Sequence, residues 1–319
     1  MTAFERMCRD LDLLRADKKV LSPDACTPIQ KDPLAILTFA VWGDPQIASW
    51  SALRSARVEA ACADIANMAE PLDALILAGD LTENGRPEEF QMLQKLLSAS
   101  RNGFQKLLCV SGNHDIRMRS FYSQRRRFAE FVESVPGGIA GSRKKYYHKT
   151  VLNGITFLMM GSDRATFEAS HISRAQLDWL ESELSESAKD RVVFVVNHQT
   201  LKNTNGLPET WLGKGDWRGT IGKQSDAVQS IFEKHNNVFF ITGHLHYGTC
   251  ATTYEDHGAF RCLSVPTVGV VNHGCMDKPT QGYVVEVYDD HIRLRARIFG
   301  EGKYLPQDHP GADIFIPLS

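Results

Sequence analysis

The chain has 319 residues, of which 43% are hydrophobic and 23% charged, enough to form the core of one large domain or two modest ones. Its formal net charge of -2 argues against general binding to nucleic acids or membrane surfaces, because both need a clear basic excess. No apolar run approaches the roughly 20 residues that span a bilayer, so we expect no membrane partner.

The N-terminus and the cysteines indicate a cytoplasmic protein. The first six residues mix charged and apolar side chains and lack the continuous apolar core of a signal peptide. Seven cysteines are scattered along the chain without a Cys-x-x-Cys pair, which is typical of reduced thiols in a core. We therefore expect a cytoplasmic location.

The first 34 residues differ from those that follow. Apolar residues such as Leu11 and Leu14 have helical spacing, and a connector with three prolines comes next. We expect an N-terminal helical extension over 1–34 and one catalytic domain over 35–319.

Apolar runs then alternate with helical patterns, as is typical of parallel strands joined by helices. The runs 36–42, 74–78 and 106–110 predict buried strands. The alanine-rich stretch 50–68 and the stretch 87–103 predict the helices between them.

The middle of the chain continues this alternation. Residues 116–135 predict a helix whose Arg125, Arg126 and Arg127 face water. Asn153-Gly154 predicts a hairpin turn, and Ser173 with Gln176 has the form of a capping box.

Two more buried strands are predicted, over 192–196 and 238–241. The glycine-rich stretch 199–222 between them contains Trp211 and Trp217 and is long enough to predict a functional loop. The C-terminal part predicts short strands alone, over 259–265, 283–288 and 292–298.

Polar blocks follow five of the predicted strands. They supply two carboxylates, one amide and three imidazoles: Asp44, Asp80, Asn113, His198, His244 and His246. Oxygen and nitrogen donors without a thiolate suit manganese, iron or zinc. Six ligands exceed what one tetrahedral ion uses, so we expect two ions that share a carboxylate, about 3.5 to 4 Å apart.

The ordered blocks resemble the calcineurin-like metallophosphoesterase superfamily, over roughly residues 36–298. The resemblance implies an α/β fold, a four-layer α/β/β/α sandwich of mixed sheets flanked by helices. It implies two divalent or mixed-valence ions (Mn, Fe or Zn) bridged by Asp80. Asp44 and His246 would hold one ion, and Asn113, His198 and His244 the other.

One position departs from the family pattern. The family usually has Asp-x-His in the first block, whereas here Gln46 follows Asp44 and Pro45. We expect Gln46 still to ligate. Because an amide oxygen is a weaker donor than an imidazole, the first site should bind its ion less tightly.

The resemblance also implies a mechanism for phosphoester hydrolysis. A metal-bound hydroxide would attack phosphorus in line, and His114 would protonate the leaving alkoxide, oriented by Asp115. Together with Asn113 and His114, Arg117 is a candidate for substrate binding. Asp163 and His273 are further candidates for the site.

The substrate is expected to be a small phosphoester, and a diester is favoured over a monoester. Arg117, the stretch 176–181 and the overall length look like the branch that resembles class III cyclic nucleotide phosphodiesterases. Trp211 and Trp217 would either stack on a substrate ring or fix their loop to the core.

Two alternatives remain open at this point. A nuclease of the same fold would need Arg125–Arg127 and Arg143–Lys145 to line a nucleic-acid track. The second alternative is a non-catalytic binding module that retains its metals. Gln46, in place of the usual histidine, is the reason to consider it. The sequence does not predict the oligomeric state.

Overall fold

The computed structural model describes residues 26–118, 120–187, 191–206, 219–272 and 280–318. The helix expected near the N-terminus lies outside these residues, and 26–34 contain no helix or strand. Among the described residues, no helix combines the length and apolarity that crossing a bilayer requires.

The first sheet has seven strands within the described residues, in the order β12-β11-β10-β1-β2-β3 with β13 paired to β11. Its centre is formed by three parallel strands, β1 (Leu37–Trp42), β2 (Leu72–Leu77) and β3 (Phe104–Cys109). The strand β10 (Gln281–Val287) runs antiparallel to β1. The others are β11 (His291–Ile298), β12 (Lys303–Tyr304) and β13 (Asp313–Pro317).

The second sheet has six strands within the described residues, in the order β4-β5-β6-β7-β9-β8. Its four inner strands are parallel: β5 (Ile155–Met159), β6 (Val193–Val196), β7 (Val238–Thr242) and β9 (Phe260–Ser264). The antiparallel edges are β4 (His148–Leu152) and β8 (Tyr254–Asp256).

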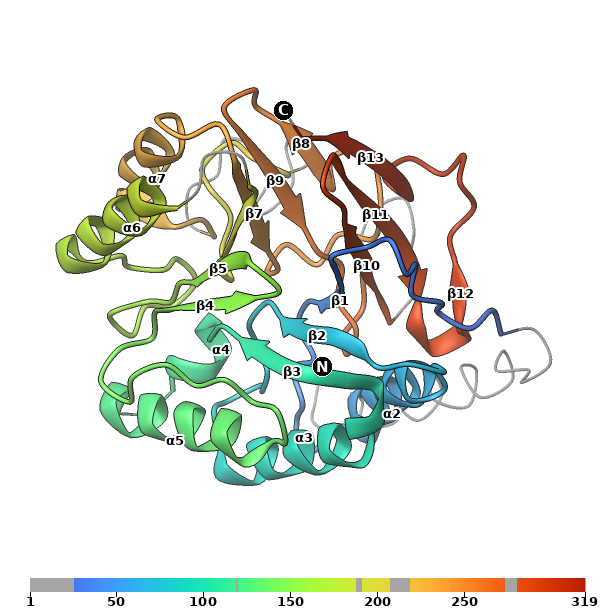
Figure 1. The fold of residues 1–319 in the computed structure, drawn as a ribbon. Coiled ribbons are helices and arrows are strands. Elements are labelled where there is room, and N and C mark those ends of the chain that lie inside the picture. Colours follow the sequence, from blue (N-terminus) through green and yellow to red (C-terminus); the bar gives the residue numbers. More distant parts are fainter. Residues whose placement is uncertain (1–25, 119, 188–190, 207–218, 273–279, 319) are drawn as a thin grey trace.

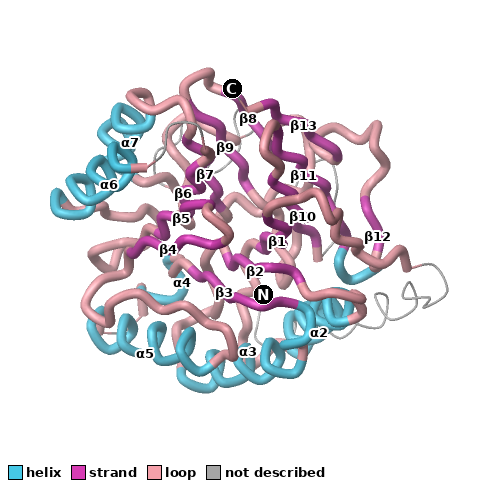
Figure 2. The backbone as a smooth tube through the Cα atoms, viewed as in Figure 1, coloured by secondary structure: helices cyan, strands magenta, loops and turns pink. Residues whose placement is uncertain are grey.

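Helices cover the outer faces of both sheets (Figures 1 and 2). The helices α2 (Ala52–Ala66), α3 (Pro87–Ala99) and α5 (Phe121–Ser134) pack on the first sheet. The helices α6 (Arg174–Glu186) and α7 (Ser225–Phe232) pack on the second. The predicted four-layer α/β/β/α sandwich is therefore confirmed.

The central strands are apolar along their whole length because both of their faces are buried. In β1, Phe39 faces the second sheet, where its ring lies 5.5 Å from that of Phe157 and 5.2 Å from that of Phe194. Trp42 points the other way, into the core beneath α2. Successive side chains of a strand point to opposite faces, so a strand between two layers needs an apolar residue at every position.

The strand register brings the ends of neighbouring strands level. Trp42 pairs with Leu77 and Leu77 with Cys109 in the first sheet, and Val196 pairs with Ile241 in the second. The polar blocks that follow these residues are therefore brought to one edge.

Three local predictions can be compared with the structure. The hairpin turn at Asn153 and Gly154 is confirmed, with φ of 49° and 80°. The helix predicted over 116–135 starts later, at Phe121, because the chain first forms the separate short helix α4 (Asn113–Ile116). Ser173 accepts a hydrogen bond from the backbone of Gln176, as a capping box requires, but the side chain of Gln176 bonds to Gly161 and Asp163 instead.

The prediction that three consecutive arginines face water is wrong for two of them. Arg126 is exposed, but Arg125 is half-buried and lies over the rings of Phe121 and Tyr122. Arg127 donates a hydrogen bond to the carbonyl of Gly85.

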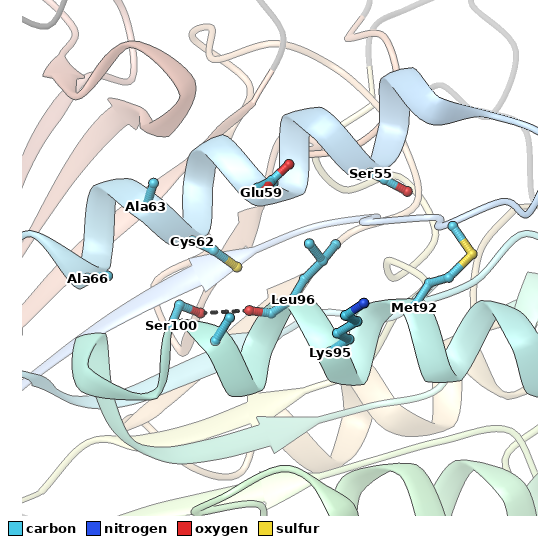
Figure 3. Close-up of a pocket in the computed structure, with 10 residues that line it drawn as sticks. Ser55, Glu59, Cys62, Ala63, Ala66, Met92, Lys95, Leu96 and Ser100 are labelled. Carbon is cyan, nitrogen blue, oxygen red and sulfur yellow. Dashed lines mark hydrogen bonds between the residues drawn. The ribbon is translucent and has the colours of Figure 1, made fainter.

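A groove of about 490 Å³ separates α2 from α3 (Figure 3). It is lined by apolar and small side chains, among them Cys62 and Met92, and by the charged Glu59 and Lys95. Ser100 closes one end through its bond to the Leu96 carbonyl. None of its lining residues belongs to the polar blocks at the strand ends.

A buried ion pair joins α2 to the first sheet. The Arg297 guanidinium is fully buried and donates to both oxygens of Asp64, at 2.7 and 2.6 Å, and to the carbonyl of Thr27. We expect Asp64→Ala to reduce the free energy of unfolding by about 3–5 kcal/mol, because it leaves a buried charge unpaired. Urea denaturation measures this. Asp226→Ala, which breaks an exposed pair with Lys202, should cost less than about 1 kcal/mol; equal losses would contradict the assignment.

Candidate metal centre

Polar side chains from five strand ends converge at one edge of the two sheets, as predicted. His246 Nε2 lies 3.0 Å from Asp44 Oδ1, and His198 Nε2 lies 3.2 Å from both Asp80 Oδ2 and His244 Nδ1. His246 is partly buried, and the other candidate ligands are buried: Asp44, Gln46, Asp80, Asn113, His198 and His244.

These side chains form two overlapping groups that could each hold an ion. Asp80, His198 and His244 make one group, and Asp44, Asp80 and His246 make the other. Within each group the donor atoms lie within 4.8 Å of one another. Asp80 is common to both groups, as expected for a carboxylate that bridges two ions.

Three atoms that could coordinate a metal at this edge have no hydrogen-bond partner among the described residues. Gln46 Oε1, Asn113 Oδ1 and His244 Nε2 are all buried and unsatisfied. A buried polar atom without a partner is costly, and a bound ion is one explanation for such atoms. The donor set therefore fits a pair of metal ions.

The backbone at the candidate ligands is held in an unfavourable conformation. Asp44, Gln46, Asp80, His244 and His246 have φ between 42° and 72°, and they are five of the nine described non-glycine residues with positive φ. Such conformations cost free energy and cluster at functional sites. The strand ends are therefore bent to direct these side chains inward.

Gly112 is required by a close approach of two segments. A Cβ at this position would lie 2.1 Å from Asp80 Oδ1 and 2.3 Å from Asp80 N. The glycine at the start of the Gly-Asn-His-Asp block thus allows the bridging carboxylate to lie against the next block.

Electrostatics couple the buried carboxylates to the histidines. Burial alone lowers the pKa of His198, but Asp80 and Asp44 outweigh it and raise the pKa to about 9. Burial and the neighbouring His198 hold the pKa of His244 well below its ordinary value. His198 Nδ1 lies 2.8 Å from the Ala78 carbonyl, which directs Nε2 toward the centre. Histidines that bind metals typically donate their other ring N–H to a carbonyl or carboxylate in this way.

Asp115 does not contact the imidazole of His114, contrary to the expected orienting role. Its carboxylate accepts hydrogen bonds from Leu81 N, Thr82 N, Thr82 Oγ1 and Gly112 N at 2.8–3.1 Å. Burial, reinforced by the charge of Asp80, raises the pKa of Asp115 to about 7. Because Asp115 points back under the loop after β2, it fixes two ligand-bearing loops to each other.

His114 is oriented instead by a residue that sequence reasoning missed. Its Nδ1 lies 2.9 Å from the main-chain carbonyl of Glu83 and 3.6 Å from the Glu83 carboxylate. Its backbone N–H donates to Asp80 Oδ1 at 2.8 Å. Glu83 follows the bridging Asp80 by three residues, so its place in that block was a usable signal.

Arg117 lies beside this imidazole, with Nη2 2.9 Å from His114 Nδ1. Its Nη1 also lies 3.4 Å from Glu168, a second residue that sequence reasoning missed. Glu168 belongs to the loop between β5 and α6, and no motif in the sequence marks it.

Among the described residues, one further sequence candidate, Asp163, does not join the centre. Asp163 accepts hydrogen bonds from Ser173 N and Gln176 Nε2 and so anchors the start of α6. His273, Trp211 and Trp217 lie outside the described residues.

We expect Gly112→Ala to displace Asp80 and to remove both metal binding and any activity that depends on it. The φ of Gly112 is -98°, so the effect would come from the close approach and not from backbone strain. Calorimetric titration with Mn²⁺ measures the loss. Gly258→Ala is the control, since its Cβ would meet nothing within 4 Å; it should leave Mn²⁺ binding unchanged although its φ is +78°. Normal Mn²⁺ binding by Gly112→Ala would contradict the packing argument.

Comparison with known proteins agrees with this geometry. The family model described as calcineurin-like phosphoesterase matches residues 37–248. A probable cyclic nucleotide phosphodiesterase of Rhodococcus erythropolis is 27% identical over 191 residues, which cover 59% of this chain and 56% of that protein. A cAMP/cGMP dual specificity phosphodiesterase of Mycobacterium tuberculosis is 25% identical over 183 residues, covering 56% of this chain and 50% of that protein.

The chain thus spans about half the length of the curated relatives it matches. Among solved structures, a purple acid phosphatase from yellow lupin seeds shares the fold, with a TM-score of 0.63 at 14% identity. That match covers 88% of this chain and 53% of the lupin protein.

Proposed function

Because the chain belongs to the calcineurin-like phosphoesterase family, we propose that it hydrolyses a small phosphodiester in a metal-dependent reaction. The observation that carries the proposal is the pair of overlapping donor groups that share the buried carboxylate of Asp80. The names of the two relatives favour a cyclic nucleotide or another diester over a monoester.

Seven side chains would hold the ions. Asp44, Gln46 and His246 would hold one, and Asn113, His198 and His244 the other, with Asp80 between them. Bound ions of this kind lower the pKa of water and neutralise charge that grows on the phosphoryl oxygens. Manganese, iron and zinc all suit this mixture of oxygen and nitrogen donors.

His114 would donate a proton to the leaving oxygen. With Nδ1–H donating to the Glu83 carbonyl, Nε2 is the atom left to carry the transferred proton; it lies 3.9 Å from Asp80 Oδ2. Glu83 is therefore a positioning residue in this mechanism, and Asp115 orders the loop that carries His114.

Arg117 would bind the phosphoryl group of the substrate. It can donate to His114 Nδ1 only while that nitrogen carries no proton. When His114 is protonated at both nitrogens, Nδ1–H donates to Glu83 and the positive ring repels the guanidinium. Arg117 is then available to the phosphoryl oxygens.

A nuclease with the same fold is less well supported. Arg125 lies over two rings of its own helix, and Arg127 donates to the Gly85 carbonyl. Arg143 forms an ion pair with Glu133. These arginines are therefore not all free to line a nucleic-acid track. A cytoplasmic location is supported by five described cysteines that are all free thiols.

We expect the protein to hydrolyse bis(p-nitrophenyl) phosphate faster than p-nitrophenyl phosphate in the presence of Mn²⁺. Removing metal with a chelator should abolish both reactions, and adding Mn²⁺ back should restore them, because the reaction depends on the ions. Release of p-nitrophenolate measures both rates. A protein that takes up Mn²⁺ but hydrolyses neither ester would be a binding module and not an enzyme.

We expect His114→Ala to reduce kcat by about 10²- to 10⁴-fold for a cyclic nucleotide, whose leaving group is a poor alkoxide. The loss should be much smaller for bis(p-nitrophenyl) phosphate, because p-nitrophenolate leaves without a proton. His257→Ala, which changes a histidine paired with Glu255 on the second sheet, is the control and should retain full activity. Equal losses on both substrates would argue against the acid role.

A further inference from the structure

Two of the candidate ligands, Gln46 and Asn113, are amides. An amide ends in one oxygen and one nitrogen, and only the oxygen can bind a cation. If the amide were turned over, its N–H groups would face the ion inside a buried site. Each amide therefore needs a contact that holds its nitrogen away from the centre.

Gln46 has such a contact in Glu83. Its Nε2 donates to Glu83 Oε2 at 3.0 Å and also lies 3.2 Å from both ring nitrogens of His114. Its Oε1 is buried without a partner among the described residues. The glutamate is itself held by Arg54, whose Nη1 lies 2.5 Å from Glu83 Oε2 and 3.0 Å from the Gln46 carbonyl. The guanidinium of Arg54 lies 4.9 Å from the ring of Trp50.

Asn113 has the same arrangement on the other side of the centre. Its Nδ2 donates to Glu168 Oε2 at 3.3 Å, while its Oδ1 is buried and unpartnered in the described part of the chain. Glu168 pairs with Arg117, whose guanidinium lies 5.2 Å from the ring of Phe167. Gln199 also holds the main chain of Glu168, through a bond to its carbonyl at 3.0 Å.

We propose that Glu83 and Glu168 are positioning residues that set the orientation of the two amide ligands. Each carboxylate accepts the amide N–H and so directs the amide oxygen toward the ion, and each is held in place by an arginine. The proposal rests on the metal-dependent function proposed above. A glutamine can therefore serve as a ligand in the first block, because Glu83 directs the oxygen of its amide toward the ion.

Glu168 allows the cleaner test. Glu83 also contacts His114, so changing Glu83 would alter proton transfer as well as metal binding. The measurement is therefore Mn²⁺ affinity by calorimetry without substrate, in which the acid role of His114 plays no part.

We expect Glu168→Ala to weaken one of the two bound Mn²⁺ ions by about 10- to 100-fold, as loss of an outer-shell partner typically does. Glu168→Gln should bind Mn²⁺ nearly as well as the wild type, because its amide oxygen still accepts from Asn113 Nδ2. Glu183→Ala is the matched control. Glu183 has the same side-chain exposure of 20% and also pairs with a cation, Lys149, but it lies on α6.

The decisive variant is Asn113→Asp, because both ends of a carboxylate are oxygens and need no orientation. In this background we expect Glu168→Ala to leave Mn²⁺ affinity unchanged or to improve it, since it also removes a neighbouring negative charge. In the same way, Gln46→Glu should abolish the effect of Glu83→Ala on Mn²⁺ affinity.

Two outcomes would overturn the proposal. One is wild-type Mn²⁺ affinity in Glu168→Ala, and the other is an equal loss from Glu168→Ala in the presence and absence of Asn113→Asp. A wild type that binds two Mn²⁺ ions but hydrolyses neither ester would overturn the proposed hydrolase function and leave this one standing. Thermal melting of each variant shows that it is folded.

Discussion

The site depends on the buried carboxylate of Asp80. It accepts the backbone N–H of His114, lies 3.2 Å from His198 Nε2 and belongs to both groups of candidate ligands. A fully desolvated carboxylate is stable only among cations or strong donors, and here histidines from both sheets surround it. The loops after β3, β6 and β7 are therefore arranged around one negative charge at the end of β2.

The central strands and the convergence of ligands could be predicted from short-range patterns, whereas the four-layer arrangement was implied by the family resemblance. Apolar runs with no alternation indicated strands buried on both faces, and a polar block after each run indicated one functional edge. The register of Trp42, Leu77 and Cys109 then brings these blocks level, as parallel pairing requires. Short strands such as β12, with two residues, carry too little pattern to be predicted.

What the sequence could not supply is the direction in which each side chain points. Asp115 follows His114 directly, yet its carboxylate turns away to Leu81 and Thr82, while Glu83 contacts the imidazole from 31 residues earlier. Glu168 has no motif and reaches Asn113 only because its loop lies over the site. The charge of Arg125 and Arg127 predicted exposure to solvent, but Arg125 lies over two rings of its own helix and Arg127 bonds to the distant Gly85 carbonyl.

The candidate ligands come from both sheets, and this has a consequence for the molecule as a whole. The backbone of His244, which follows β7, already donates to Asp44, which follows β1 and lies 200 residues away. A cation bound at this edge would add coordination bonds across the same junction, at which the two halves of the sandwich meet. It would act as a cross-link between distant parts of the chain, and the free energy of unfolding would rise with the logarithm of its free concentration.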